Sequence, residues 1–412
     1  MNRFSFTIIL LGLFLPNVFS QRLNDAIRVF VNDADFKFGG ISISILDVEN
    51  GKLLAGHNPN LGLIPASSLK VITTATALHF LGDSFRFKTE LQYDGEIDMN
   101  GTLNGNLFVK GYGDPTLGSA YFDKAEKLDV VMHKFVEAIQ ASGIKKVNGR
   151  IIGDASFFES EVIGSKWLWE DLGNYYGAGS YGLNIQENLY FIDFKQMREV
   201  KEKPPIVAIR PSIPNLLLIN EVKSDVKGSG DNAYIFGAPY TYTRHVRGTI
   251  PVGENKFTIK GSIPDPPFFA AHYLAGFLEK NGIETSKLTA SYFDLERENK
   301  ISTVKRNIIF IYQSPPLRDI VKRTNMKSVN LYCEAMLRML GKKMKGKGTP
   351  KAGLEVVYDF LKERNSATFS NFKELSKDSS ISGFRVLNSN PIELSKSLLL
   401  GDSEPNTIFI CS

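Results

Sequence analysis

The sequence predicts a mixed α/β (α+β) fold, in which a large and mostly β segment is inserted into a core of sheet and helices. Three patterns indicate this: a β-hairpin followed by an apolar helix near the N-terminus, short strands with turn residues from about 89 to 286, and helical periodicity afterwards. The chain has 412 residues, 43% of them hydrophobic, which is enough for more than one domain.

Residues 1–20 have the pattern of a signal peptide. Arg3 precedes an apolar run over residues 4–15, and Val18-Phe19-Ser20 offers a cleavage point before Gln21. The run is too short for a comfortable membrane span, and no later stretch is transmembrane by its pattern. We therefore expect a periplasmic or secreted protein with no transmembrane segment in the mature chain.

Residues 21–88 are expected to form the first part of the core. A helix-like segment at 23–31 precedes residues 41–45, which alternate as a half-buried strand does, and Asn50-Gly51 makes the turn of a β-hairpin. Pro65-Ala66-Ser67 then opens an apolar run that ends at Gly82, which is the pattern of a buried helix.

Residues 89–286 are expected to form the inserted part, and residues 287–412 the second part of the core. Strand patterns recur at 206–219 and 234–263, and a helix at 128–141 interrupts them. Helical periodicity follows at 267–278, 317–324, 331–340 and 354–361.

Charge and histidine spacing exclude several classes of function. Lys and Arg number 49 against 44 Asp and Glu, and the net charge of +5 is too small and too dispersed to indicate nucleic-acid binding. The five histidines show no metal-ligand spacing. We expect no metal and no cofactor.

Ser67 and Lys70 form the first candidate catalytic pair. Ser-x-x-Lys alone is weak evidence, since it also occurs at Ser142, Ser224, Ser302 and Ser370. Only Ser67 follows a proline at the start of an apolar helix, where Lys70, three residues on, can reach its hydroxyl. A lysine whose pKa is lowered can then act as the base for a serine nucleophile. The alternative is a helix cap beside a surface charge.

Ser328-Val329-Asn330 is the second candidate motif and the only Ser-x-Asn in the chain. It stands just before the helical run at 331–340. A hydroxyl and an amide at a helix edge can relay a proton and orient a peptide substrate. Serine and asparagine are also common helix caps, so this motif too is weak by itself.

In this order, Ser-x-x-Lys and Ser-x-Asn are two of the three motifs of β-lactamases and penicillin-binding proteins. Their separation of 261 residues resembles the class C low-molecular-mass penicillin-binding proteins, the D-Ala-D-Ala carboxypeptidases/endopeptidases of serine peptidase family S13. The similarity extends over about residues 22–400 and includes Pro65–Lys70, Gly113–Leu117, Gly153–Phe158 and Ser314–Leu317.

The resemblance implies a β-lactamase/transpeptidase-like core and a role for each candidate. Ser67 would be the acylated nucleophile and Lys70 its base, with Ser328 as catalytic relay and Asn330 as substrate-binding residue. Peptidoglycan peptides and β-lactams would be the binding partners. Gly113–Leu117 and Gly153–Phe158 are interpreted as turns of the inserted part rather than catalytic segments.

The third family motif, Lys-Thr-Gly on a strand, occurs nowhere in the sequence. The comparable turn reads Asp378-Ser379-Ser380-Ile381-Ser382-Gly383. We therefore expect a chain truncated relative to its relatives, and loss of one oxyanion-hole donor typically costs ~10²–10³ in rate. The alternative function is a catalytically defective peptidoglycan-binding protein. A β-lactam hydrolase is less favoured because of the long insertion.

Overall fold

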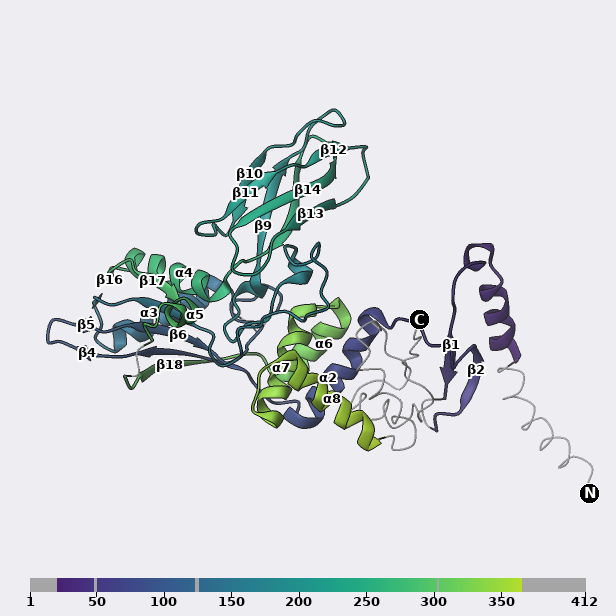
Figure 1. The fold of residues 1–412 in the computed structure, drawn as a ribbon, viewed down its shortest axis with the longest axis horizontal. Coiled ribbons are helices and arrows are strands. Elements are labelled where there is room, and N and C mark those ends of the chain that lie inside the picture. Colours follow the sequence, from purple (N-terminus) through teal and green to yellow (C-terminus); the bar gives the residue numbers. More distant parts are fainter. Residues whose placement is uncertain (1–20, 48–49, 123–125, 302–303, 365–412) are drawn as a thin grey trace, which may run out of the picture. The chain divides into compact units, whose positions relative to one another are not determined.

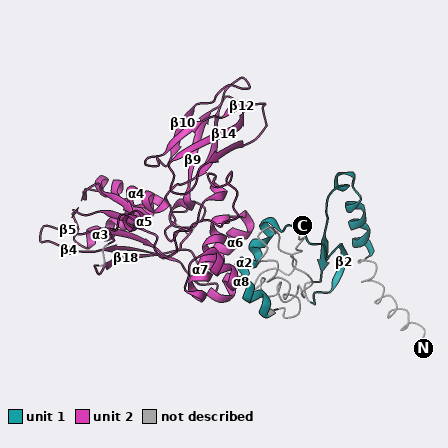
Figure 2. Ribbon diagram, in the orientation of Figure 1, with its two compact units in different colours: residues 1–75, 357–412 teal, residues 76–356 magenta. Residues whose placement is uncertain are grey.

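The computed structural model describes residues 21–47, 50–122, 126–301 and 304–364. The expected signal peptide, the turn at 378–383 and everything else beyond residue 364 lie outside the described residues. The chain divides into two compact units, residues 1–75 with 357–412 and residues 76–356 (Figure 2). No helix within the described ranges is both long and apolar enough to cross a bilayer.

Unit 1 contains the predicted hairpin. Its described residues begin with a helix over 21–31 and a 3-10 turn, η1 (Ala34–Phe36). Strands β1 (Ile43–Leu46) and β2 (Leu53–His57) then pair antiparallel, with Ile43 opposite His57. The 3-10 turn η2 (Ala66–Ser68) leads directly into α2 (Leu69–Leu81). Gly82 follows α2 with φ of +84°, a conformation that favours glycine, and so ends the helix as predicted.

A five-stranded sheet organises unit 2 (Figure 1). Its strand order is β17 (Thr289–Ser291), β8 (Ile151–Asp154), β6 (Leu107–Gly111), β3 (Lys88–Tyr93) and β18 (Asn307–Gln313). β17, β8 and β6 run parallel, whereas β3 and β18 are antiparallel to their neighbours. β3, at the start of the expected inserted segment, pairs with β18, which lies beyond the expected end of that segment at residue 286.

Alternation along the strands gives this sheet two apolar faces. Leu107 and Val109 of β6 point into the main core, whereas Phe108 belongs to a smaller cluster with Ile152. Helices α3 (Leu128–Ala141) and α4 (Pro266–Lys280) pack on the first face, and α5 (Tyr292–Arg297) packs on the second. The result is an α/β/α arrangement, and α3 has the bounds that the sequence predicted.

The remaining strands of unit 2 form three further sheets (Figure 1). A small sheet has the order β16 (Glu284–Thr285), β7 (Lys146–Val147), β5 (Thr102–Asn104), β4 (Glu96–Ile97). A second contains β10 (Ile206–Arg210), β9 (Leu189–Lys195) and β15 (Lys256–Ser262). In the third, β14 (Thr243–Pro251) pairs with β11 (Leu217–Asn220), β12 (Lys223–Asp225) and β13 (Asn232–Phe236). The strand patterns at 206–219 and 234–263 are thus confirmed.

Helices follow the sheets. α6 (Leu317–Lys327) and α7 (Asn330–Lys345) lie in unit 2 and pack against each other. α8 (Pro350–Arg364) comes next, and the unit boundary after Val356 falls inside it. These confirm the helices predicted at 317–324, 331–340 and 354–361. Two more 3-10 turns, η3 (Tyr175–Gly177) and η4 (Gln186–Asn188), lie between β8 and β9.

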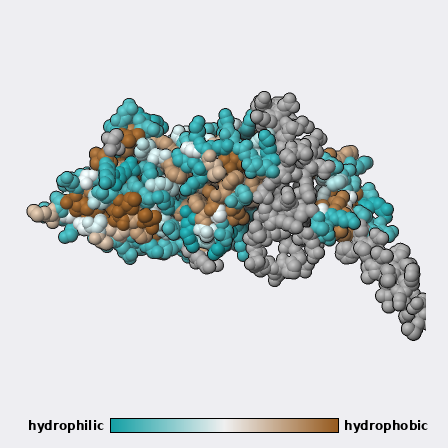
Figure 3. All heavy atoms as spheres, turned by 90° about the horizontal axis from the view of Figure 1, so that it is seen from below, coloured by the Kyte–Doolittle hydropathy of each residue, from teal (hydrophilic) through white to brown (hydrophobic). Residues whose placement is uncertain are grey.

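β18 is the edge strand of the five-stranded sheet and carries exposed apolar side chains. Ile308 and Ile311 are about half exposed. Seen from below, hydrophobic residues gather over the part of unit 2 where β18 lies (Figure 3). The mixed sheet-and-helix architecture agrees with the predicted fold class.

Candidate active site

Ser67 and Lys70 are in hydrogen-bond contact in unit 1. Ser67 is the middle residue of η2 and is exposed, and Lys70, in the first turn of α2, is half-buried. Lys70 Nζ donates to Ser67 Oγ over 2.9 Å. A lysine nitrogen held at this distance is where a general base for the serine hydroxyl must be, provided that the lysine is neutral when it acts.

The backbone just before Ser67 is in a strained conformation. Ala66 has φ of +44°, in the left-handed region, which costs a residue with a Cβ roughly 1–2 kcal/mol. Such residues concentrate at functional sites, where the surrounding structure holds them. Ala66 is the first residue of η2, so its conformation sets the direction of this turn and with it the position of the Ser67 hydroxyl.

Ser328 and Asn330 flank the junction of α6 and α7 in unit 2. Ser328 follows α6 with φ of +55° and ψ of 40°, a left-handed residue that ends the helix. Asn330 is the first residue of α7, and its side-chain Nδ2 donates to the carbonyl oxygen of Tyr176 over 2.8 Å. Ser328 is exposed and Asn330 half-buried, so one side chain of the motif is anchored to η3 and the other lies at the surface.

A buried carboxylate that no sequence motif indicated lies beside this junction. Glu187 is 5% exposed, and Tyr332 of α7 donates a hydrogen bond from its hydroxyl to Glu187 Oε1 over 2.8 Å. Burial raises the pKa of Glu187 to about 7. The only sequence signal was a polar Gln186-Glu187-Asn188 step inside an otherwise apolar run, and this pattern normally indicates an exposed turn.

The segment Gly153–Phe158 holds a second buried acid. Asp154 ends β8 and accepts hydrogen bonds from Lys110 over 3.2 Å and Arg306 over 2.5 Å. Burial alone would raise the pKa of Asp154, but Lys110, Ser156 and Arg306 outweigh it and hold this pKa below its usual value. The carboxylate therefore joins β8 to β6 and to the start of β18.

In the other family-like segment, Gly113 has φ of +87° and lies against the ring of Phe158. The next residue, Asp114, is buried, and it accepts hydrogen bonds from the backbone and hydroxyl of Thr116. Burial raises the pKa of Asp114 to about 6. The backbone at Gly113 needs glycine, which agrees with the interpretation of this segment as a turn.

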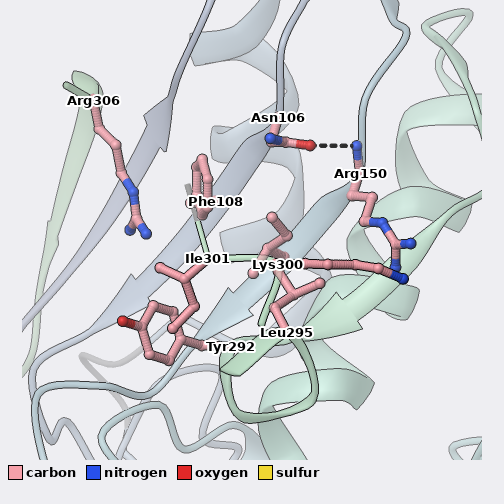
Figure 4. A pocket seen from close by; sticks show the side chains of 9 residues that line it. Asn106, Phe108, Arg150, Tyr292, Leu295, Lys300, Ile301 and Arg306 are labelled. Atoms are coloured by element: carbon pink, nitrogen blue, oxygen red, sulfur yellow. Dashed lines mark hydrogen bonds between the residues drawn. The ribbon is translucent and has the colours of Figure 1, made fainter. Parts of the chain in front are cut away.

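A pocket of about 180 Å³ lies on the α5 face of the five-stranded sheet. Arg306 and Arg150 stand on opposite sides, with Phe108, Leu295 and Tyr292 between them (Figure 4). None of the four predicted site residues lines it. No group of three or more His, Cys, Asp or Glu side chains within the described ranges could hold a metal ion.

Comparisons with known proteins agree with the motif order. The model of the D-Ala-D-Ala carboxypeptidase 3 (S13) family matches residues 23–380. A D-alanyl-D-alanine carboxypeptidase from Actinomadura sp. is 25% identical over 349 residues, which cover 82% of this chain and 61% of the relative. D-alanyl-D-alanine carboxypeptidase DacB from Haemophilus influenzae is 25% identical over 340 residues, covering 80% and 65%. This chain thus spans less than two thirds of the length of either relative.

The solved structures support the fold. Penicillin binding protein 4 from Haemophilus influenzae matches with a TM-score of 0.63 at 22% identity, over 79% of this chain and 67% of that chain. Its complex with a β-lactam gives a TM-score of 0.58 at 20% identity, over 79% and 66%. At these identities the likeness establishes a shared fold.

Proposed function

Because the chain belongs to the D-Ala-D-Ala carboxypeptidase 3 (S13) family, we propose that it is a serine-type carboxypeptidase acting on peptidoglycan stem peptides. The observation that carries the proposal is the hydrogen bond of 2.9 Å between Lys70 Nζ and Ser67 Oγ, in the Ser-x-x-Lys that leads into the apolar helix α2. The relatives named as D-alanyl-D-alanine carboxypeptidases support the choice of substrate.

The proposed first half-reaction forms an acyl-enzyme. Ser67 Oγ attacks the carbonyl carbon of the penultimate D-Ala while neutral Lys70 takes the hydroxyl proton. The C–N bond to the terminal D-Ala breaks, and the leaving amine takes up a proton. In the second half-reaction, water attacks the ester carbonyl, the Ser67 oxygen leaves with a proton, and the shortened peptide is released.

Ser328 and Asn330 have supporting roles in this proposal. The hydroxyl of Ser328 relays the proton towards the leaving amine, and the amide of Asn330 orients the substrate peptide. The hydrogen bond from Asn330 to Tyr176 supports the second role, because it fixes the side chain of Asn330 before substrate arrives. Endopeptidase action is the same chemistry on a cross-linked peptide, in which the amine that leaves belongs to a neighbouring stem.

These 412 residues contain no Lys-Thr-Gly motif. By resemblance, that motif supplies an oxyanion donor and a cation for the terminal carboxylate of the substrate. We therefore propose that Ser67 in these residues alone is acylated slowly, at a rate ~10²–10³ lower than in a protein that has this oxyanion donor. Covalent attachment is still expected, because the nucleophile and its base are both present.

The test is covalent labelling with a fluorescent penicillin. The wild-type protein is expected to be labelled over long incubation, and Ser67→Ala is expected not to be. Ser142→Ala is the matched control, because Ser142 belongs to another Ser-x-x-Lys but caps α3 and donates to the carbonyl oxygen of Ile139 over 2.7 Å.

Two results would contradict the proposal. Equal labelling of wild type and Ser67→Ala would remove Ser67 as the nucleophile. Unlabelled wild-type protein that still sediments with purified peptidoglycan would instead favour the alternative, a peptidoglycan-binding protein without catalysis.

A further inference from the structure

Glu187 lies in a short segment whose backbone is held in an unfavourable conformation. Gln186, Glu187 and Asn188 have φ of +49°, +51° and +52° in succession, a region that residues with a Cβ seldom enter. The side chain of Asn188 holds the segment, because it donates to Gly179 O over 2.9 Å and accepts from the backbone N–H of Ile185 over 3.0 Å. Glu187 is therefore presented to its surroundings by a fixed turn.

Groups from three directions face the carboxylate of Glu187. Tyr332 of α7 donates to Oε1 over 2.8 Å, and Ser119, from the loop after β6, also forms a hydrogen bond with it. Arg323 of α6 attracts the carboxylate, whereas the nearby acid Asp114 opposes its ionisation. Burial removes the carboxylate from water, so these contacts replace the hydrogen bonds that water would have made.

Arg323 and Tyr332 lie on α6 and α7, the two helices that flank Ser328. Arg323 lies five residues before it on α6, with its guanidinium 4.3 Å from the centre of the Tyr121 ring. Tyr332 lies four residues after it on α7, with its ring stacked on Phe122 at 6.0 Å. The same loop, residues 119–122, therefore contacts both helices next to the acid.

We propose that Glu187 is a positioning residue, which through Tyr332 fixes the first turn of α7 and so sets the orientation of Ser328 and Asn330. Its catalytic consequence rests on the proposed function, whereas its effect on the turn is a local structural property. Misplacement of a catalytic group by about 1 Å can lower a rate ~10²-fold, so a contact outside the reacting groups can matter to the reaction.

The test compares four variants of the full chain. Glu187→Leu removes the acceptor, Glu187→Gln retains an oxygen that can accept from Tyr332, and Tyr332→Phe removes the donor but keeps the ring on Phe122. Asp193→Asn is the matched control, because Asp193 is also a buried acid of unit 2 but pairs with Arg210 over 2.7 Å and Lys256 over 3.0 Å. Backbone amide exchange at residues 328–332 and the rate of penicillin labelling are measured on each.

Glu187→Leu and Tyr332→Phe are expected to raise amide exchange at 328–332 about tenfold and to slow labelling by ~10–10²-fold. Glu187→Gln is expected to stay close to wild type in both measurements. Asp193→Asn is expected to change exchange in β9 and leave residues 328–332 protected.

Unchanged exchange at 328–332 in Tyr332→Phe would overturn the proposal, and that variant decides the matter if Glu187→Leu does not fold. If Asp193→Asn raised amide exchange at residues 328–332 as much as Glu187→Leu, the proposal would also be overturned, since the effect would then follow from the loss of any buried acid in unit 2. If wild-type protein takes no label, the proposed function fails, but the exchange comparison still decides whether Glu187 positions the turn.

Discussion

Asp265 provides a test of how burial and helix capping compete at one carboxylate. It is the N-cap of α4, and its side chain accepts a hydrogen bond from the backbone N–H of Phe268 over 2.9 Å. This bond and the positive end of the helix favour the ionised form. The side chain is only 3% exposed, however, and burial favours the neutral form.

Burial prevails and raises the pKa of Asp265 from 3.8 to about 7, with the nearby Asp294 acting in the same direction. The folded state then holds a proton that the unfolded state has already released. The stabilising contribution is therefore fully present below about pH 3.8 and is lost as the pH rises through about 7. A shift of about three pKa units corresponds to ~4 kcal/mol.

Asp265→Asn keeps the capping oxygen and removes the titration. The free energy of unfolding of the variant is expected to match wild type near pH 4 and to exceed it by up to ~4 kcal/mol at pH 8. Urea unfolding followed by tryptophan fluorescence reports on the right unit, because Trp167 and Trp169 are the two tryptophans of the chain and both lie in unit 2. The reasoning would be refuted if the difference in free energy of unfolding between variant and wild type stayed constant with pH. It would also be refuted if wild type became more stable relative to the variant as the pH rises.

Three further substitutions test other contacts. Lys70→Ala is expected to abolish penicillin labelling, because the variant lacks the base next to Ser67. Little change in thermal stability is expected, since Lys70 is only half-buried. Labelling of the variant at the wild-type rate would exclude Lys70 as the base. Arg244→Met is expected to raise the free energy of unfolding by ~1–4 kcal/mol. The reason is that the buried Nε and Nη1 of Arg244 have no hydrogen-bond partner among the described residues. A loss of stability of the variant in urea would contradict this. Gly153→Ala is expected to lower the free energy of unfolding by ~1–3 kcal/mol, because a Cβ at residue 153 would lie 1.9 Å from the carbonyl oxygen of Pro267. An unchanged urea midpoint would contradict this and would show that α4 can move away from β8.

Local signals carried most of what the sequence could predict. The Asn50-Gly51 turn identified the hairpin of β1 and β2, and Gly82 marked the end of α2, because each depends on backbone preferences within a few residues. The pairing of Lys70 with Ser67 was predictable for the same reason, since three positions on a helix lie on nearly the same face.

Features that depend on distant partners were not predictable in this way. Nothing in the composition of residues 307–313 indicates that they pair with β3, more than two hundred positions earlier in the chain. Glu187 was missed because a glutamate is normally exposed, and its burial depends on Tyr332 and on a left-handed backbone that glutamate seldom adopts. The order of the motifs indicated the family, but the contacts that anchor Asn330 required the structure.

The pairing of β3 with β18 has a consequence for how this architecture can be taken apart. Lys88 lies opposite Gln313, so the chain enters and leaves the sheet at adjacent points. A short linker can join two such points at a small entropic cost. A module grafted between Lys88 and Gln313 would therefore have matched end points. It would also have to replace Tyr176 and Glu187, because their contacts with Asn330 and Tyr332 hold the start of α7 from within residues 89–312.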